Sequence, residues 1–159
     1  MLDVACVFVF GLFFGEFVGY WIHRFLHLKV TGSLYRAHMA HHLKAYPPDD
    51  LLSKEYRTVG FESTTYRFVI AGVFLGLVFF LLTPMRFSVP MAVAMAFLGW
   101  LNSYIHDATH IDGHFLERFA IFKKLRALHK VHHKLDMSRN YGIVTFMNDK
   151  VFKTFEEQP

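Results

Sequence analysis

The sequence predicts an all-α membrane protein, with about three transmembrane helices and a cytoplasmic helical cap that holds a histidine-ligated dimetal centre. Three observations predict this class. Hydrophobic residues make up 53% of the 159 residues, and the mean hydropathy is +0.28. Three apolar stretches approach the length of a bilayer span, and all 11 histidines fall in four compact clusters. The apolar content exceeds what is usual in soluble domains, and the length allows a single domain over residues 1–159.

The three apolar stretches lie at about residues 4–22, 68–85 and 87–105. Each is close to the ~20 residues that a helix needs to cross a bilayer. The first stretch lacks the basic start and the small-residue cleavage site of a signal peptide, so we expect it to be retained. The short turn TPMRFSVP, with its two prolines, predicts that the second and third spans form an antiparallel pair.

One ionisable residue, Glu16, interrupts the first stretch. An ionisable group inside a span is costly and by default suggests a function. Gly15 and Gly19 flank it, however, and small residues permit close helix packing. We therefore interpret Glu16 as a neutral, hydrogen-bonded packing residue, and the lone Cys6 as a small packing residue that forms no disulfide.

Lysine and arginine are distributed unevenly around these stretches. Seven lie between the first and second stretches, nine follow the third, and only Arg86 lies in the turn between the second and third. The positive-inside rule places both basic regions in the cytoplasm. The same regions contain all four histidine clusters. We therefore expect the clusters on the cytoplasmic side of a membrane, the endoplasmic reticulum in a eukaryotic host or the inner membrane in a bacterium.

The four histidine clusters are HRFLH (23–27), HMAHH (38–42), HDATHIDGH (106–114) and HKVHH (129–133). Residues three and four apart share one face of a helix, so each cluster presents two or three imidazoles in one direction. Four such faces can converge on two metal ions. Imidazole suits iron, zinc and copper alike, so the ligand type leaves the metal open. The one cysteine lies far from the clusters, which disfavours a closed structural zinc site.

Two further segments complete the expected cap. Residues 114–135 place apolar side chains three and four positions apart, which predicts one amphipathic helix. Its basic residues face either anionic lipid headgroups or solvent. The sequence YPPDD at 46–50 predicts a loop that ends the HMAHH helix.

The order HX3H, HX2HH, a long apolar stretch, HX3H and HX2HH resembles the histidine signature of the fatty acid hydroxylase/sterol desaturase superfamily, which are integral-membrane oxygenases with a dimetal centre. The likeness extends to HRFLHLKVTGSLYRAHMAHH and to HKVHHKLDMSRNYGIVTFMNDKVFKTF, which contains NYG and a D-x-x-F-x-T tail; Lys153 stands where the family commonly has glycine. The resemblance implies ten metal ligands: His23, His27, His38, His41, His42, His106, His110, His129, His132 and His133.

The resemblance also implies a reaction. It implies two iron ions, which zinc can replace in a purified sample, with O2 as co-substrate and a C–H bond of a fatty acyl or sphingolipid chain as the target. No side-chain acid or base breaks such a bond, so the metal centre carries the chemistry. The sequence contains no haem, flavin, nicotinamide or nucleic-acid motif. We therefore expect a separate cytochrome b5-like or ferredoxin-like donor with its reductase. The sequence leaves open whether the protein forms an oligomer in which a second subunit completes the lipid cavity.

Other functions fit parts of this pattern. A carotenoid hydroxylase, a sterol oxidase or a desaturase has the same centre, and the outcome depends on which carbon is held nearest the oxidant. A haem-binding electron carrier would pair histidines inside the bilayer. A non-catalytic metal-binding or metal-transporting protein would place polar ligands along a path through the membrane, and the second and third stretches offer none.

Four residues in or near the clusters are not among the ten implied ligands. His114 follows His110 by four residues and is able to replace or supplement a ligand, but it has no counterpart in the family motif, so we interpret it as a supporting or surface histidine. Asp107 and Asp112 are able to orient a ligating imidazole through its second nitrogen, although a solvent-exposed acid is the simpler interpretation for either one. Asn140 belongs to the NYG element, which we interpret first as a structural turn that Gly142 makes accessible.

Overall fold

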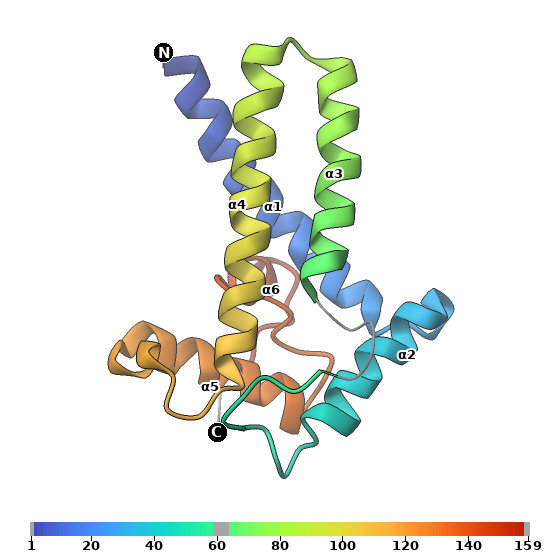
Figure 1. The fold of residues 1–159 in the computed structure, drawn as a ribbon, viewed down its shortest axis with the longest axis vertical. Coiled ribbons are helices and arrows are strands. Elements are labelled where there is room, and N and C mark those ends of the chain that lie inside the picture. Colours follow the sequence, from blue (N-terminus) through green and yellow to red (C-terminus); the bar gives the residue numbers. More distant parts are fainter. Residues whose placement is uncertain (1, 59–63, 158–159) are drawn as a thin grey trace.

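The computed structural model describes residues 2–58 and 64–157, and Figure 1 shows a helical stalk above a wider helical cap. The described residues contain no β-strand, only an isolated parallel bridge between Ser53 and Ile111. The all-helical class that the sequence predicts is therefore confirmed. The elements in chain order are α1 (Leu2–Leu26), η1 (Lys29–Thr31), α2 (Ser33–Ala40), η2 (His41–Ala45), α3 (Thr64–Leu82), α4 (Met85–Thr109), η3 (Phe115–Arg118), α5 (Ala120–Lys134) and α6 (Met147–Val151).

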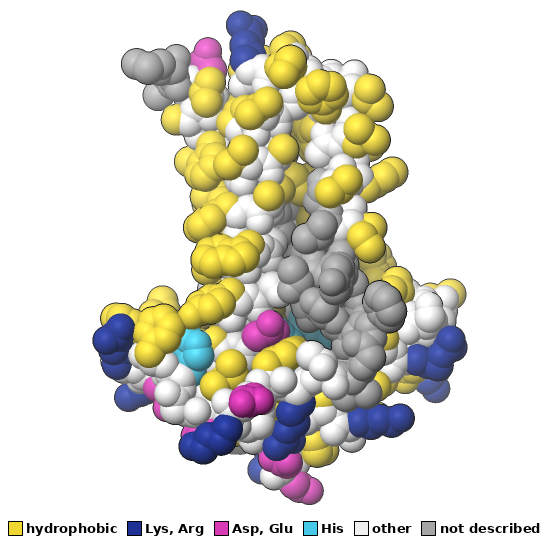
Figure 2. All heavy atoms as spheres, viewed as in Figure 1, with side chains coloured by type: hydrophobic (Ala, Val, Ile, Leu, Met, Phe, Trp, Pro, Cys, Tyr) yellow, Lys and Arg dark blue, Asp and Glu magenta, His cyan; other side chains and the backbone are white. Residues whose placement is uncertain are grey.

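Two stalk helices are long and apolar enough to cross a membrane. They are Asp3–Leu26 within α1 and Met85–Thr109, which is the whole of α4. Figure 2 shows hydrophobic side chains covering the stalk, with most charged side chains gathered on the cap. Both helices extend past the predicted ends of the first and third spans, because the first histidine of a cluster continues each helix. His23 and His106 thus belong to the stalk helices themselves.

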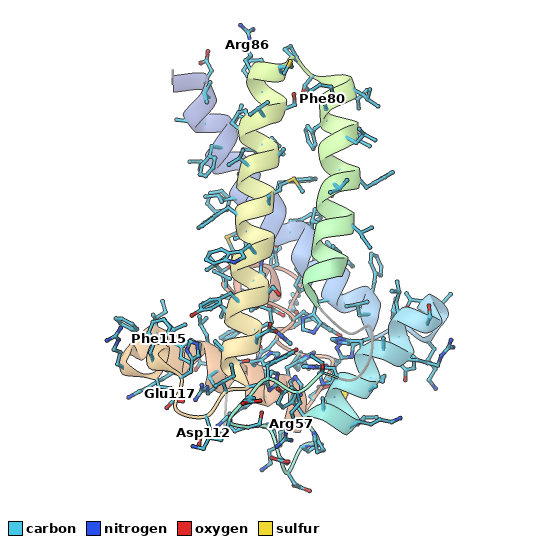
Figure 3. The ribbon with its side chains drawn as sticks, in the orientation of Figure 1. Arg57, Phe80, Arg86, Asp112, Phe115 and Glu117 are labelled. Atoms are coloured by element: carbon cyan, nitrogen blue, oxygen red, sulfur yellow. The ribbon has the colours of Figure 1, made fainter. Side chains whose placement is uncertain are left out.

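The third stalk helix, α3, begins and ends about three to four residues earlier than the predicted span 68–85. Its described apolar part, Val73–Leu82, is shorter than a span, so a third transmembrane helix stays a prediction. The predicted antiparallel pair is present, since α3 and α4 run side by side and are joined by a short turn. Pro84 caps the start of α4, and Phe80 and Arg86 mark this end of the stalk in Figure 3.

The packing of α1 on α4 fixes how the two stalk helices are aligned. A Cβ atom on Gly11 would lie 2.8 Å from Cβ of Ala94, and one on Gly15 would lie 2.9 Å from Cδ2 of Leu98. Only glycine allows this approach at those two positions. The two residues of each pair are separated by the same number of positions in the sequence, and the same number separates His23 from His106. The parallel helices therefore deliver one histidine each to the same level of the molecule.

The cap consists of α2 and η2 on one side and α5 on the other (Figure 1). The loop predicted at 46–50 is confirmed, because η2 ends at Ala45 and Tyr46 leaves the helical conformation. Arg57 holds that loop by donating to the carbonyl oxygen of Ala45 at 3.0 Å and to the carboxylate of Asp50 at 2.7 Å.

The single amphipathic helix predicted over 114–135 is wrong, since the segment divides into η3 and α5. Phe119 breaks it in an extended conformation, with φ −96° and ψ 128°. The physical reason is tertiary. Arg126 of α5 donates to Glu117 at 2.6 Å and to the carbonyl oxygens of Ala108 and Ile111 at 3.0 and 2.7 Å, which folds the chain before Phe119 back across α5. The spacing of hydrophobic residues in the sequence cannot predict such contacts.

Candidate metal centre

Ten of the 11 histidines meet in the cap as two groups of five. Within each group, one ring nitrogen from every residue lies within 4.8 Å of all the others. The first group is His23, His27, His38, His42 and His132, and the second is His41, His106, His110, His129 and His133. These are the ten residues that the family motif implies as ligands. The structure brings all ten together, while their role as ligands stays a prediction.

Each group draws four histidines from one half of the chain and one from the other half. Adjacent residues separate, so that His41 joins the second group and His42 the first, and His132 joins the first group and His133 the second. The expectation that each cluster presents its rings in one direction is therefore wrong for the HX2HH clusters. Neighbouring residues on a helix point about 100° apart, and α5 and the π-helical turn η2 lie where this divergence reaches both groups.

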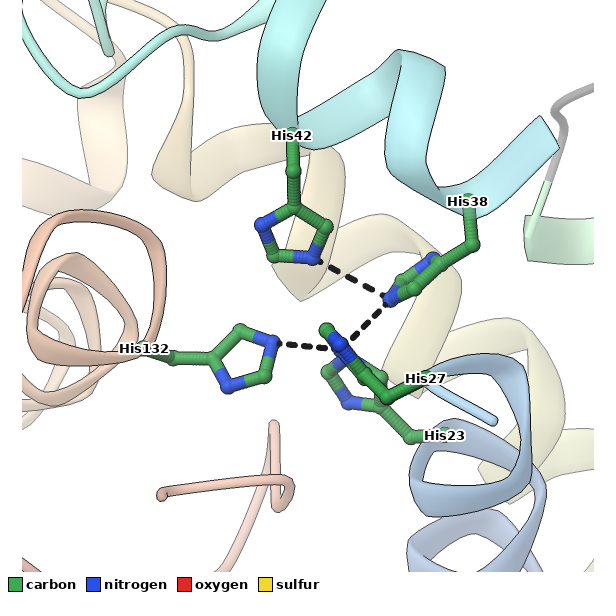
Figure 4. A group of neighbouring side chains, drawn as sticks. All are labelled: His23, His27, His38, His42 and His132. Carbon is green, nitrogen blue, oxygen red and sulfur yellow. Dashed lines mark hydrogen bonds between the residues drawn. The ribbon is translucent and has the colours of Figure 1, made fainter. Parts of the chain in front are cut away.

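The rings of the first group converge through their Nε2 atoms (Figure 4). The Nε2 of His38 lies 2.9 Å from that of His27 and 3.1 Å from that of His42, and the Nε2 atoms of His27 and His132 are 3.1 Å apart. One proton satisfies a single nitrogen pair, whereas a cation at the centre satisfies several lone pairs together. This arrangement suits a cation better than a hydrogen-bonded network.

The second group is entirely buried and lies against the first. In this group, the Nε2 atoms of His110 and His129 are 3.1 Å apart. His42 of the first group stacks on His133 of the second, with ring centroids 4.0 Å apart. The two groups therefore form one continuous histidine cluster with two centres.

Backbone carbonyl groups orient four of the rings. The Nδ1 of His23 donates to the carbonyl oxygen of Tyr141, and the Nδ1 of His132 donates to that of Arg139, both at 2.6 Å. His110 donates likewise to Leu51 at 3.1 Å, and His133 to Tyr46 at 3.4 Å. These contacts assign the proton to Nδ1 and leave Nε2 as a lone pair directed at the group centre. Metal-binding histidines are commonly held in this way.

Burial lowers the pKa of several of the clustered histidines and so favours their neutral form. It lowers the pKa of His27, the least buried of the first group, to about 4. For His132 and His133 burial again is the main cause that lowers the pKa, with neighbouring histidines second, and both values fall well below the ordinary range. A neutral imidazole is the form that binds metal.

The distances fit a metal ion in each group. Nitrogen ligands at about 2.1 Å from an ion and at right angles to each other are about 3 Å apart, which matches the closest separations here. In the second group, the buried Nε2 atoms of His41 and His133 have no hydrogen-bond partner among the described residues. Buried polar atoms normally have one. Two metal ions would supply the missing partners, and imidazole alone does not decide which metal.

The structure places the four other candidate residues, Asp107, Asp112, His114 and Asn140, in different surroundings. Asp107 lies 3.2 Å from Nδ1 of His106 through Oδ1, the contact expected of an orienting carboxylate. Asp112 lies instead at the edge of the cap, where it pairs with Lys54 at 3.0 Å (Figure 3). His114 lies outside both groups, and its Nδ1 accepts a hydrogen bond from the backbone of Leu116 at the start of η3.

Asn140 stabilises a turn and belongs to neither histidine group. It is fully buried with a φ of 52°, and its side-chain Nδ2 donates to the carbonyl oxygens of Leu128 and Glu156. The predicted turn is present, but its left-handed residue is Asn140 and not Gly142. Gly142 is required for space, because a Cβ there would overlap the carbonyl oxygen of Thr145.

Asp149 is a supporting residue that our sequence reasoning missed. Its carboxylate is fully buried and accepts from the backbone amides of Tyr141 and Gly142 and from Thr154 Oγ1, each at 2.8 Å. Tyr141 in turn accepts from His23. Asp149 and Thr154 are the polar residues of the D-x-x-F-x-T tail, so the motif contained the signal for them.

A narrow cavity connects the histidines with the membrane helices. Residues of both groups line it, namely His23, His38 and His106. Glu16 and Asn102 line it as well, on the stalk side. It measures about 20 Å³, which is room for about one water molecule.

The comparison with known families gives one match. A family model described as fatty acid hydroxylase matches residues 8–154, which is nearly the whole chain. No curated protein and no solved structure matches the chain.

Proposed function

The chain belongs to the fatty acid hydroxylase family, and from this premise we propose that it is a membrane-bound, di-iron, O2-dependent lipid hydroxylase. The substrate would be a fatty acyl or sphingolipid chain. The single observation that carries the proposal is the meeting of ten histidines in two groups at the ends of two apolar helices, beside a small cavity that residues of both helices line.

The proposed reaction converts R–H, O2, two electrons and two protons into R–OH and H2O. Iron, when bound, would supply the activation of dioxygen that no side chain supplies. The ten histidines would hold the two ions, and the carbonyl oxygens of Tyr141 and Arg139 keep two of the rings oriented. The two electrons come from outside the chain, and we assign them to a separate one-electron carrier protein with its reductase.

The position of the site supports a lipid substrate. The apolar helices α1 and α4, together with the family, make this a membrane protein. The histidine groups lie where these helices leave their apolar part. A lipid therefore reaches the site without leaving the membrane. We propose that this end faces the cytoplasm, on the basis of the charge distribution along the chain.

A desaturase, a carotenoid hydroxylase or a sterol oxidase would use the same centre. The outcome depends on which carbon and which second hydrogen are held nearest the oxidant. The geometry of the histidines is common to all four reactions, so the products have to be measured.

The experiment is lipid mass spectrometry of cells that express this protein with a competent reductase. The variants are His132→Ala, which removes a member of the first group, and His114→Ala, which removes the one histidine outside both groups. We expect lipids that are one oxygen atom heavier with the wild type and with His114→Ala, and none with His132→Ala.

Two outcomes would redirect the proposal. Lipids lighter by two hydrogen atoms would identify a desaturase. Lipids unchanged by a protein that contains its full metal complement, in membranes that contain fatty acyl, sphingolipid, sterol and carotenoid substrates, would contradict a lipid-oxidising enzyme.

A further inference from the structure

The cavity beside the histidine groups contains two buried polar side chains that the proposed metal centre does not use. Glu16 on α1 is 8% exposed and Asn102 on α4 is 4% exposed, and both line the cavity with His23 and His106. They lie on the membrane side of the histidines. Glu16 precedes His23 by about two helical turns, and Asn102 precedes His106 by about one.

Both side chains bring hydrogen-bonding groups to the cavity. Glu16 Oε2 accepts from Thr145 Oγ1 at 2.9 Å, which confirms the predicted hydrogen-bonded state, but the buried Oε1 has no partner among the described residues. The side-chain amide of the buried Asn102 lines the same cavity and supplies both a donor and an acceptor. An unsatisfied buried polar group costs about 1–3 kcal/mol, so the unpartnered Oε1 of Glu16 at this cavity indicates that something polar occupies it.

The alignment of α1 with α4 brings these two groups near one another. Gly15 packs against Leu98, and the same offset places Gly19 at the level of Asn102. Glu16 lies about one helical turn deeper than Gly19, which is ~5 Å along the helix. Glu16 and Asn102 thus line the cavity from two helices below the histidines, with Glu16 about one helical turn deeper than Asn102.

We infer that Glu16 and Asn102 bind a hydroxyl group of the lipid substrate and thereby position the chain for oxidation. A hydroxyl group donates one hydrogen bond and accepts others, so it can donate to Glu16 Oε1 while it accepts from the Asn102 amide. A plain hydrocarbon segment at this level leaves the buried Oε1 of Glu16 without a partner. The inference rests on the proposed function and narrows its substrate class to lipids that carry a hydroxyl group near the oxidised carbon.

Such a site selects strongly. A site built to hydrogen-bond a hydroxyl group rejects an analogue without it by far more than a site that only measures apolar size, because the polar groups of the protein are left unpaired. The cavity in its present form admits only about one water molecule. Substrate entry therefore requires the elements that line the cavity, among them α1 and the loop that carries Tyr141 and Gly142, to move apart. Glu16 bridges these two segments through Thr145.

The test measures binding without turnover. Purified zinc-loaded protein in detergent is titrated with 1-hexadecanol and with heptadecane, in which a methyl group replaces the hydroxyl group, and bound ligand is counted by native mass spectrometry. We expect the wild type to bind the alcohol at least tenfold more tightly than the alkane. Glu16→Leu and Asn102→Leu should each reduce that preference to about threefold or less.

Ser88→Ala is the matched control, because Ser88 is a buried polar residue of α4 whose hydroxyl group has a single hydrogen-bond partner among the described residues, the carbonyl oxygen of Pro84 at the start of that helix. This variant should keep the preference. Unchanged zinc content in all three variants shows that the histidine groups are intact.

A wild type that binds alcohol and alkane equally would overturn the inference, and would mean that the two side chains hold only water. A preference that persists in Glu16→Leu and Asn102→Leu would overturn it as well. The proposed function is tested separately by oxidised lipids in cells, so a hydroxyl preference without oxidised products would defeat the proposed function and leave this binding site standing.

Discussion

At the scale of single residues, the site depends on adjacent histidines whose side chains point to different histidine groups. His41 and His42 come from one turn, and His132 and His133 from one helix, yet each pair serves both groups. His42 and His133 then stack on one another between the centres. Losing any of these four rings is therefore expected to disturb both groups.

The histidine motif, through the family that it resembles, was enough to predict which ten residues meet. It was not enough to predict how they divide, because the division depends on the directions from which four separate helices approach. Asp149 was missed for a related reason. A buried acid that accepts backbone amides from a distant loop resembles any other aspartate in sequence, unless the tail motif around it is considered.

At this scale we predict that Asp149→Ala weakens both the fold and metal binding. The change leaves the amides of Tyr141 and Gly142 without their acceptor, and hydrogen bonds to a charged group contribute about 1.5–3 kcal/mol each. Losing a group that supports a metal ligand typically costs about 10–100-fold in metal affinity. Thermal unfolding and zinc titration of the purified protein check both effects.

Asp112→Ala is the control, since that carboxylate pairs with Lys54 at the exposed edge of the cap. It should leave the melting temperature and the metal affinity nearly unchanged. Equal effects of the two substitutions would show that the buried network around Asp149 does not support the centre.

At the scale of elements, the packing of α1 on α4 determines the level along the stalk at which His23 and His106 lie. The apolar stretches in the sequence predicted both helices and the hairpin of α3 and α4. The break at Phe119 could not be predicted, because Arg126 produces it through contacts with residues that precede η3. The extension of α1 and α4 through His23 and His106 likewise follows from packing within the cap.

We predict that Gly11→Ala destabilises the protein and lowers its metal content, although Gly11 lies far from the histidines. A Cβ atom at this position lies 2.8 Å from that of Ala94, so the helices must move apart or shift. Overpacking of this kind costs about 1–3 kcal/mol. Thermal unfolding and the metal-to-protein ratio are the measurements.

Gly76→Ala on α3 provides the comparison, because its added Cβ would lie 3.9 Å from that of Ala92, an ordinary contact. Alanine is favoured over glycine in a helix by about 1 kcal/mol, so this variant should be as stable as the wild type or more stable. If Gly11→Ala were equally harmless, the alignment of α1 and α4 would not control the site.

At the scale of the whole molecule, an apolar stalk and a charged cap meet at the histidine groups. The composition predicted this division, and the charge distribution predicts that the cap faces the cytoplasm. The ten histidines are held by elements from both halves of the chain, including the C-terminal segment that carries Tyr141. Two metal ions, each bound by histidines from both halves, would therefore connect these elements further.

We predict that removing the metal lowers the thermal stability of the entire protein. Metal that binds only the folded state stabilises it by about 2.7 kcal/mol when its free concentration is a hundredfold above its dissociation constant. Without metal, the lone pairs of the ten rings face one another in a buried space. Unfolding of the protein before and after dialysis against a chelator is the measurement, and readdition of iron or zinc should restore the melting temperature. A metal-free protein that unfolds at the same temperature would show that the histidine groups stabilise the fold unaided.

The measurement that tests the central claim most directly is the iron content per chain of the purified protein, reconstituted with ferrous iron under anaerobic conditions and determined by inductively coupled plasma mass spectrometry. Two histidine groups predict two iron ions per chain. One ion per chain, or none, in a folded protein would contradict a di-iron centre and the oxygenase function that rests on it.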